Sequence, residues 1–156
     1  MSFFSDHSIT FSGSVKLADF GSGFVASEGG SGAVLWDAKA PERLEEKFWD
    51  LPADIWALAC TILELVAGRH FFRDPSEVLR RNWTDEMFLA VVDEKLNDVA
   101  KEIETFLRDH MRDDMDTSES DMIAKLALGM LRRSPGDRMD IIQVQKMWET
   151  MYPQPC

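Results

Sequence analysis

Val15-Lys16-Leu17-Ala18-Asp19-Phe20-Gly21 is the stretch that decides how the rest of the chain is interpreted. Its apolar and β-branched side chains favour a short strand over residues 15–20. Residues 21–32 follow and are rich in glycine and serine, which predicts an irregular loop. Ala40-Pro41-Glu42 and Asp54-Ile55-Trp56 come next. The order and spacing of these three short motifs carry more information than any one of them alone.

Beyond residue 42 the sequence predicts a chain that is almost entirely helical. Residues 52–66 are apolar around nearly the whole helical circumference, which is typical of a helix at the centre of a core. Gly68 is a natural stop for that helix. Thr84 is expected to begin another helix, and a break is expected near Asn97. The remaining predictions are a solvated acidic loop over 109–121, helices over 122–131 and 141–148, and a turn over 134–137.

The three motifs resemble the second half of a eukaryotic-type serine/threonine protein kinase domain. The resemblance implies a mainly α fold: a truncated kinase-like large lobe with a short β segment before Asp-Phe-Gly. It divides the chain into an irregular segment 1–14, a partial kinase domain 15–150 and a tail 151–156. Within that domain, residues 19–42 correspond to the activation segment and 43–150 to the helical lobe. Asp-Phe-Gly-Ser and the charged segment 94–120 are loosely similar to the SR-protein kinase branch.

Asp19 is the residue to which the resemblance gives a chemical role. In the family the matching Asp binds the Mg²⁺ that bridges the ATP phosphates, and Phe20 and Gly21 let the loop switch. Without the resemblance, an Asp ahead of glycines is ordinary turn chemistry. Residues 21–26 also match the dinucleotide pattern G-x-G-x-x-A. That interpretation needs a helix at once, and residues 27–32 would break it.

The resemblance assigns structural roles to a second group of residues. Glu42 is expected to pair with Arg138, which lies almost a hundred residues away. Asp54 matches the family Asp that holds the catalytic loop, and it also suits the positive end of its own helix. Trp56 lies in the same apolar helix. Ser22, Ser27 and Ser31 are candidate phosphorylation sites, because a phosphate there could order the loop against arginines.

The sequence contains no glycine-rich phosphate loop followed by V-A-I-K, and no H-R-D motif. Phosphoryl transfer depends on positioning and electrostatic stabilisation by those parts. Mg²⁺ and ATP are therefore cofactors by resemblance only, no catalytic residue is assigned, and this isolated chain is expected to be inactive. The alternative interpretation is a pseudokinase-like module that binds other proteins.

The formal net charge of −11 disfavours nucleic acid and anionic membranes as partners and favours basic polypeptides. The apolar stretch at residues 55–68 is too short to span a bilayer, and the amino terminus lacks the pattern of a signal peptide. Cys60 and Cys156 do not form a disulfide framework. We expect a cytoplasmic or nuclear protein that meets a protein partner, or itself, through exposed apolar surface.

Overall fold

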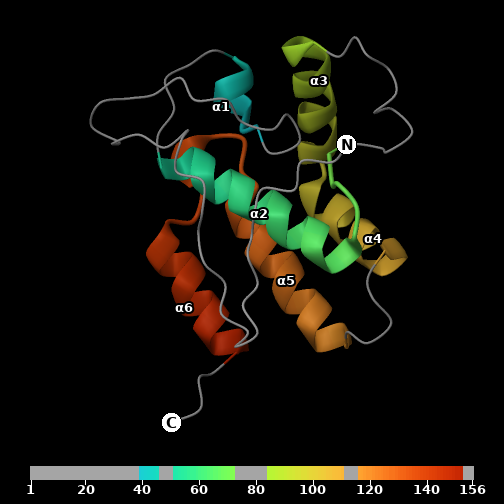
Figure 1. The fold of residues 1–156 in the computed structure, drawn as a ribbon, viewed down its shortest axis with the longest axis vertical. Helices are drawn as coiled ribbons and strands as arrows, with labels where there is room; N and C mark the ends of the chain where they lie inside the picture. The colour runs from blue at the N-terminus through green and yellow to red at the C-terminus, as the bar shows by residue number, and fades with distance from the viewer. Residues whose placement is uncertain (1–38, 46–50, 73–83, 111–115, 153–156) are drawn as a thin grey trace, which may run out of the picture. The chain divides into compact units, whose positions relative to one another are not determined.

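The computed structural model describes residues 39–45, 51–72, 84–110 and 116–152. The chain divides into the units Met1–Val34 and Leu35–Cys156, and every described residue belongs to the second unit. The elements in these ranges are α1 (Pro41–Leu44), α2 (Leu51–Ala67), α3 (Asp85–Leu96), α4 (Val99–His110), α5 (Thr117–Met130), the 3-10 helix η4 (Pro135–Asp137) and α6 (Ile141–Met151) (Figure 1). The mainly helical character expected from the sequence is confirmed for this part of the chain. The expected strand at 15–20 lies outside it.

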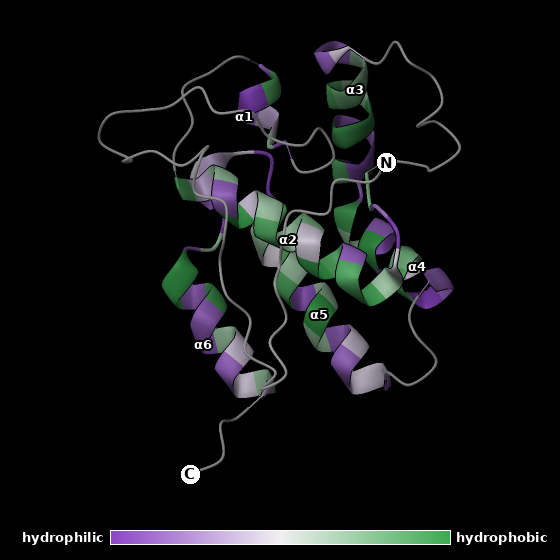
Figure 2. Cartoon of the chain, viewed as in Figure 1, coloured by the Kyte–Doolittle hydropathy of each residue, from purple (hydrophilic) through white to green (hydrophobic). Residues whose placement is uncertain are grey.

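Helix α2 is the centre of the core, as its composition predicts. Trp56, Ala59 and Leu63 are completely buried, and α2 packs against α4, α5 and η4. Figure 2 shows hydrophobic residues along most of its length. Gly68 ends the helix with φ of 65°, and its N–H donates to the carbonyl of Glu64 at 2.7 Å. The predicted stop is therefore confirmed.

One face of α2 departs from the prediction of burial all round. Leu51, Leu58 and Leu65 keep 64%, 36% and 70% of their surface exposed. These residues recur at heptad spacing, so they lie on one side of the helix. The described neighbours of α2 cover its other sides, which is why an apolar helix can still present a solvent-exposed stripe.

Helix α3 begins as predicted and is held by little apolar surface. The Thr84 hydroxyl accepts from the backbone N–H of Met87 at 3.3 Å, a side-chain cap of the first turn. Only Phe88 and Val92 are fully buried in α3, whereas Met87 is 51% exposed. The sequence pattern places Met87, Phe88, Val91 and Val92 on one apolar face, and only two of these four residues are fully buried. The predicted break at Asn97 is confirmed, because α3 ends at Leu96 and α4 starts at Val99.

The predicted acidic loop over 109–121 is wrong at both ends. Helix α4 extends through His110, and α5 starts at Thr117. Asp116 accepts from the N–H of Glu119 at 2.8 Å, and the Glu119 carboxylate accepts from the N–H of Asp116 at 3.4 Å. This capping box satisfies two backbone donors and lets an acidic segment begin a helix. The same motif, Asp140 with Gln143, starts α6.

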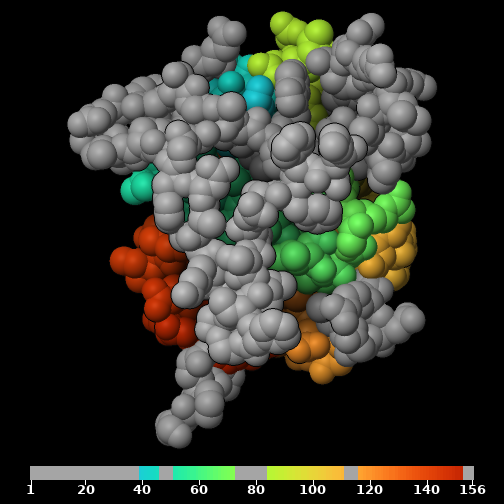
Figure 3. Space-filling model, in the orientation of Figure 1, coloured from blue at the N-terminus to red at the C-terminus, as the bar shows by residue number. Residues whose placement is uncertain are grey.

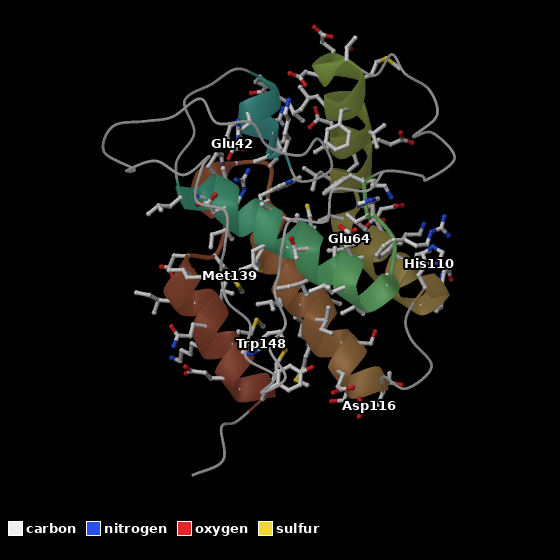
Figure 4. All side chains as sticks on the ribbon, viewed as in Figure 1. Glu42, Glu64, His110, Asp116, Met139 and Trp148 are labelled. Atoms are coloured by element: carbon white, nitrogen blue, oxygen red, sulfur yellow. The ribbon has the colours of Figure 1, made fainter. Side chains whose placement is uncertain are left out.

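The end of α5 and the chain leading into α6 approach closely at Gly129. The N–H of Met139 donates to the Gly129 carbonyl at 3.0 Å. A Cβ added at Gly129 would lie 2.6 Å from the Met139 sulfur, so the glycine makes room for that side chain. Figure 4 labels Met139 at the amino end of α6. None of the helices in the described ranges is long and apolar enough to cross a membrane.

We predict that Gly68→Ala lowers the free energy of unfolding by about 1 kcal/mol, because a side chain is strained at positive φ. Urea denaturation at constant m-value measures the change. Gly136→Ala is the matched control: its added Cβ also meets nothing within 4 Å, and its backbone does not have a positive φ. The control should be neutral or slightly stabilising. Equal losses in both variants would contradict the prediction.

Candidate functional site

The motif Ala40-Pro41-Glu42 lies inside the protein rather than on its surface. Ala40 is 1% exposed and Glu42 6% exposed, and Pro41 is also fully buried. Proline at the first helical position starts α1 without losing a hydrogen bond, since that N–H would have no helical partner. The short helix therefore delivers a carboxylate into the core, where its charge needs compensation.

Arg138 provides that compensation. Its Nη1 donates to Glu42 Oε1 and its Nη2 donates to Glu42 Oε2, both at 2.6 Å. The Arg138 side chain is fully buried and that of Glu42 is 7% exposed. Two parallel N–H···O bonds match the planar guanidinium to the planar carboxylate, the strong form of this contact. The pairing expected from the sequence is present, and Figure 4 labels Glu42 in the upper part of the molecule beside α1.

The remaining donors of Arg138 bind two backbone carbonyls. Nε donates to the carbonyl of Arg132 at 2.9 Å, and Nη1 also donates to the carbonyl of Pro52 at 2.8 Å. One side chain thus joins α1, the first turn of α2 and the segment before η4. Since the guanidinium is buried and engaged on all these sides, the arrangement holds elements together and presents no charge to a substrate.

Trp56 forms the floor of this site. The Arg138 guanidinium lies 5.1 Å from the centre of the Trp56 ring, which is within cation–π range. The Phe72 ring stacks on Trp56 at 5.1 Å between centroids. Among the described residues, the buried indole Nε1 has no hydrogen-bond partner. Trp56 therefore packs against Phe72 and contacts the Arg138 cation.

Asp54 lies near a second arginine, Arg43 in α1. Burial lowers the pKa of the Arg43 guanidinium, while the negative charges of Asp54 and Glu42 oppose that shift. Asp54 also lies in the first turn of α2, where a carboxylate suits the helix dipole. The structure thus places Asp54 in the first turn of α2, and Arg43 is a neighbour that the sequence pattern does not identify.

Arg133 was not identified from the sequence at all. Its Nε donates to Asp93 at 2.6 Å, and its Nη2 donates to Glu45, so it joins α3 to the residue after α1. Burial lowers the pKa of Arg133, but the hydrogen bonds to Glu45 and Asp93 outweigh this and leave it above the ordinary value. Lys39 similarly contacts Asp85 at 3.1 Å. Because these contacts span distant positions, no local pattern reveals them.

Several predicted site residues fall outside the described ranges. They are Asp19, Phe20, Gly21, Ser22, Ser27 and Ser31. Within the described ranges no group of three or more His, Cys, Asp or Glu side chains could hold a metal ion. Among the predicted site residues, the described ranges contain Ala40, Pro41, Glu42, Asp54, Trp56 and Arg138. All of these except the exposed Asp54 belong to a buried structural site.

Comparison with known families agrees with this arrangement. The family described as "Protein kinase domain" matches residues 6–148, which is most of the chain. The chain belongs to the protein kinase domain family.

Relatives of the chain include serine/threonine-protein kinases and mitogen-activated protein kinase kinase kinases. Serine/threonine-protein kinase TAO3 of Homo sapiens is 29% identical over 163 residues, covering 92% of this chain and 18% of the relative. Serine/threonine-protein kinase atg1 of Penicillium rubens is 31% identical over 133 residues, covering 81% and 11%. Mitogen-activated protein kinase kinase kinase 3 of Arabidopsis thaliana is 42% identical over 69 residues, covering 40% and 12%. The chain thus spans less than a fifth of the length of these relatives.

We predict that Arg138→Met lowers the free energy of unfolding by about 3–5 kcal/mol, because it leaves the Glu42 carboxylate buried without its partner. Chemical denaturation measures the loss. Arg132→Met removes the same charge from an exposed neighbour whose side chain takes no part in the pair, and it should change stability by less than about 0.5 kcal/mol.

A double variant sharpens this test. Glu42→Gln combined with Arg138→Met should cost less than the sum of the two single changes, because the buried charge is gone. Strict additivity would show that the two side chains do not depend on each other.

Proposed function

We propose that this chain is most of the large lobe of a serine/threonine protein kinase domain, with residues 19–42 as its activation segment. The observation that supports the proposal is the buried Glu42–Arg138 pair, which joins Ala40-Pro41-Glu42 to the segment before α6. The family match over residues 6–148 supports it independently. In this proposal Asp19 is the Mg²⁺ ligand, and Ser22, Ser27 and Ser31 are the sites where phosphate would act.

The proposed activity is absent from this chain taken by itself. Phosphoryl transfer needs the nucleotide phosphates to be cradled, a lysine to hold them, paired metal ligands and a residue that orients the substrate hydroxyl. The 156 residues supply one candidate for these parts, Asp19. A single ligand without the positioning groups gives no useful transition-state stabilisation. The chain therefore contributes to kinase chemistry only together with the parts it does not carry.

We predict that Mg²⁺ and ATP leave the thermal midpoint of the purified chain unchanged. A ligand that binds the native state raises stability by about 2.7 kcal/mol at a hundred times its Kd, so binding would be plain in a melting curve. Differential scanning calorimetry with and without Mg·ATP makes the measurement. An upward shift that grows with ATP concentration would contradict the prediction. If Asp19→Asn then abolished the shift, Asp19 would be its metal ligand.

A second function, a pseudokinase-like module that binds protein partners, is favoured by the exposed stripe on α2. We define the α2 stripe as Leu51, Leu58 and Leu65. A second exposed group, Ile141, Ile142 and Trp148, lies on α6, and atoms of both helices reach the surface in Figure 3. Exposed leucines at heptad spacing suit a helix that packs alongside. The α2 stripe therefore supports a helical partner.

The charge of the chain favours a basic partner over a second copy. Two copies would each carry a formal charge of −11, and like charges oppose close approach. The exposed Asp54 lies three residues after Leu51 and four before Leu58, on the same side of α2 as the stripe, and adds negative charge there. The occupant that fits is an amphipathic helix with apolar residues at heptad spacing and lysine or arginine beside them.

We predict that a synthetic helical peptide with Leu at heptad positions and flanking Lys binds the chain, and that Leu58→Ser with Leu65→Ser weakens binding at least about tenfold. Fluorescence anisotropy measures the affinity. Met87→Ser, which changes an exposed apolar side chain on α3, is the control and should leave binding unchanged. Equal binding by all variants would contradict the stripe as the site. A mass that rises with concentration in sedimentation equilibrium would favour self-association instead.

The finer assignments belong to the same proposal. The SR-protein kinase branch rests on Asp-Phe-Gly-Ser and the charged segment 94–120. A cytoplasmic or nuclear location is part of the proposal as well. Neither bears on the experiments above, which depend only on the purified chain.

A further inference from the structure

Helix α3 is anchored by less apolar contact than its length suggests. Of its twelve residues, only Phe88 and Val92 are fully buried, with 1% and 0% of their surface exposed, and Leu89 and Leu96 are partly buried against the core. Elements with few buried apolar contacts open at low free-energy cost. The position of α3 therefore depends strongly on whatever else fixes it.

Two ionic contacts supply that fixation, one near each end of α3. At the amino end, Lys39 Nζ lies 3.1 Å from Asp85, the first residue of the helix. Toward the carboxyl end, Arg133 Nε lies 2.6 Å from Asp93, and the same guanidinium bridges to Glu45. At about 1.5 Å rise per residue, Asp85 and Asp93 are separated by about 12 Å along the helix. Contacts this far apart restrain the direction of a helix as well as its distance.

The partners of both contacts flank α1 in the sequence. Lys39 stands just before Pro41–Leu44, and Glu45 is the residue that ends this short helix. Helix α1 and α3 also pack against each other. The chain around α1 is thus tied to α3 before and after the helix, and Arg133 is the bridge at the second point.

We propose that Lys39–Asp85 and Glu45–Arg133–Asp93 form a two-point ionic clamp that makes α1 and α3 one unit, so that a change in the chain entering α1 is transmitted to α3. This inference rests on the proposed function in one respect: it identifies the chain entering α1 as the activation segment. Arg133 is then a positioning residue of that segment. It acts through Glu45 and Asp93 and contacts no substrate.

The clamp differs in physical character from the buried Glu42–Arg138 pair. The side chains of Arg133, Glu45 and Asp93 are 41%, 19% and 47% exposed, so dissolved ions screen their interaction. The Glu42–Arg138 pair is shielded from solvent, and screening there is weaker. Salt should therefore loosen α3 while the attachment of α1 to Arg138 persists.

Hydrogen–deuterium exchange on the full chain tests the clamp. Arg133→Met and Lys39→Met should each speed amide exchange in α1 and α3 roughly 2- to 5-fold, the size that surface ion pairs support. Exchange in α2 and α5 should not change. The matched controls are Arg132→Met and Lys125→Met, which remove the same charges from exposed side chains outside the clamp. Arg133→Lys should exchange more slowly than Arg133→Met, because the ammonium group keeps the positive charge. It should not reach the protection of Arg133, because an ammonium lacks the planar fork of donors that bridges Glu45 and Asp93.

The double variant decides whether the two contacts act together. Once one tether is broken, the other still holds α3 at high effective concentration, so the effect of breaking both should exceed the product of the single effects. A simple product would overturn the clamp in favour of two independent surface pairs. Unchanged exchange, exchange raised equally by the controls, or exchange raised throughout α2 and α5 would overturn it too. None of these readouts involves ATP, so the clamp can fail while the kinase assignment stands, and the reverse.

Discussion

The bidentate contact between Glu42 and Arg138 is the interaction on which the rest of the described structure depends. A carboxylate and a guanidinium are both buried, and either one alone in that environment would carry a large desolvation cost. Because Arg138 also binds the carbonyls of Arg132 and Pro52, the pair sets where α1, α2 and the segment before α6 meet. The Trp56 ring packs against the Arg138 guanidinium. Geometry, more than net binding energy, is what such a pair contributes.

The buried and the partly exposed ion pairs around α1 have different structural roles. The buried Glu42–Arg138 pair attaches α1 to the core and is shielded from solvent. The ion pairs of Lys39 and Arg133 are partly exposed to solvent and attach α3 to the chain around α1. Helix α3 fully buries only two side chains, so modest ionic contacts contribute much to its position and modest changes are enough to release it. The four-residue helix α1 is thus held by a buried ion pair and by weaker, partly exposed ion pairs. It lies at the end of residues 19–42, which we propose to be the activation segment.

Much of this architecture was predictable because its signals are local. Pro41 at a helix start, Thr84 as a cap, the break at Asn97 and the stop at Gly68 each follow from the conformational preference of one residue and its nearest neighbours. The predicted loop over 109–121 is wrong at its ends because a high density of charge does not by itself prevent a helix. The Asp116–Glu119 capping box was present in the sequence and outweighs that charge, since it satisfies backbone donors that would otherwise be lost.

The sequence by itself determined the kinase motifs, the helical periodicity and the pairing of Glu42 with Arg138, which a family pattern connects across the chain. Only the tertiary structure decided that Arg133 bridges Glu45 and Asp93, that Lys39 meets Asp85, and that Leu51, Leu58 and Leu65 stay exposed on an otherwise buried helix. The physical reason is the same in each case. Burial and ion pairing between distant positions depend on how helices pack in three dimensions, and helical periodicity states which residues share a face without stating what covers it.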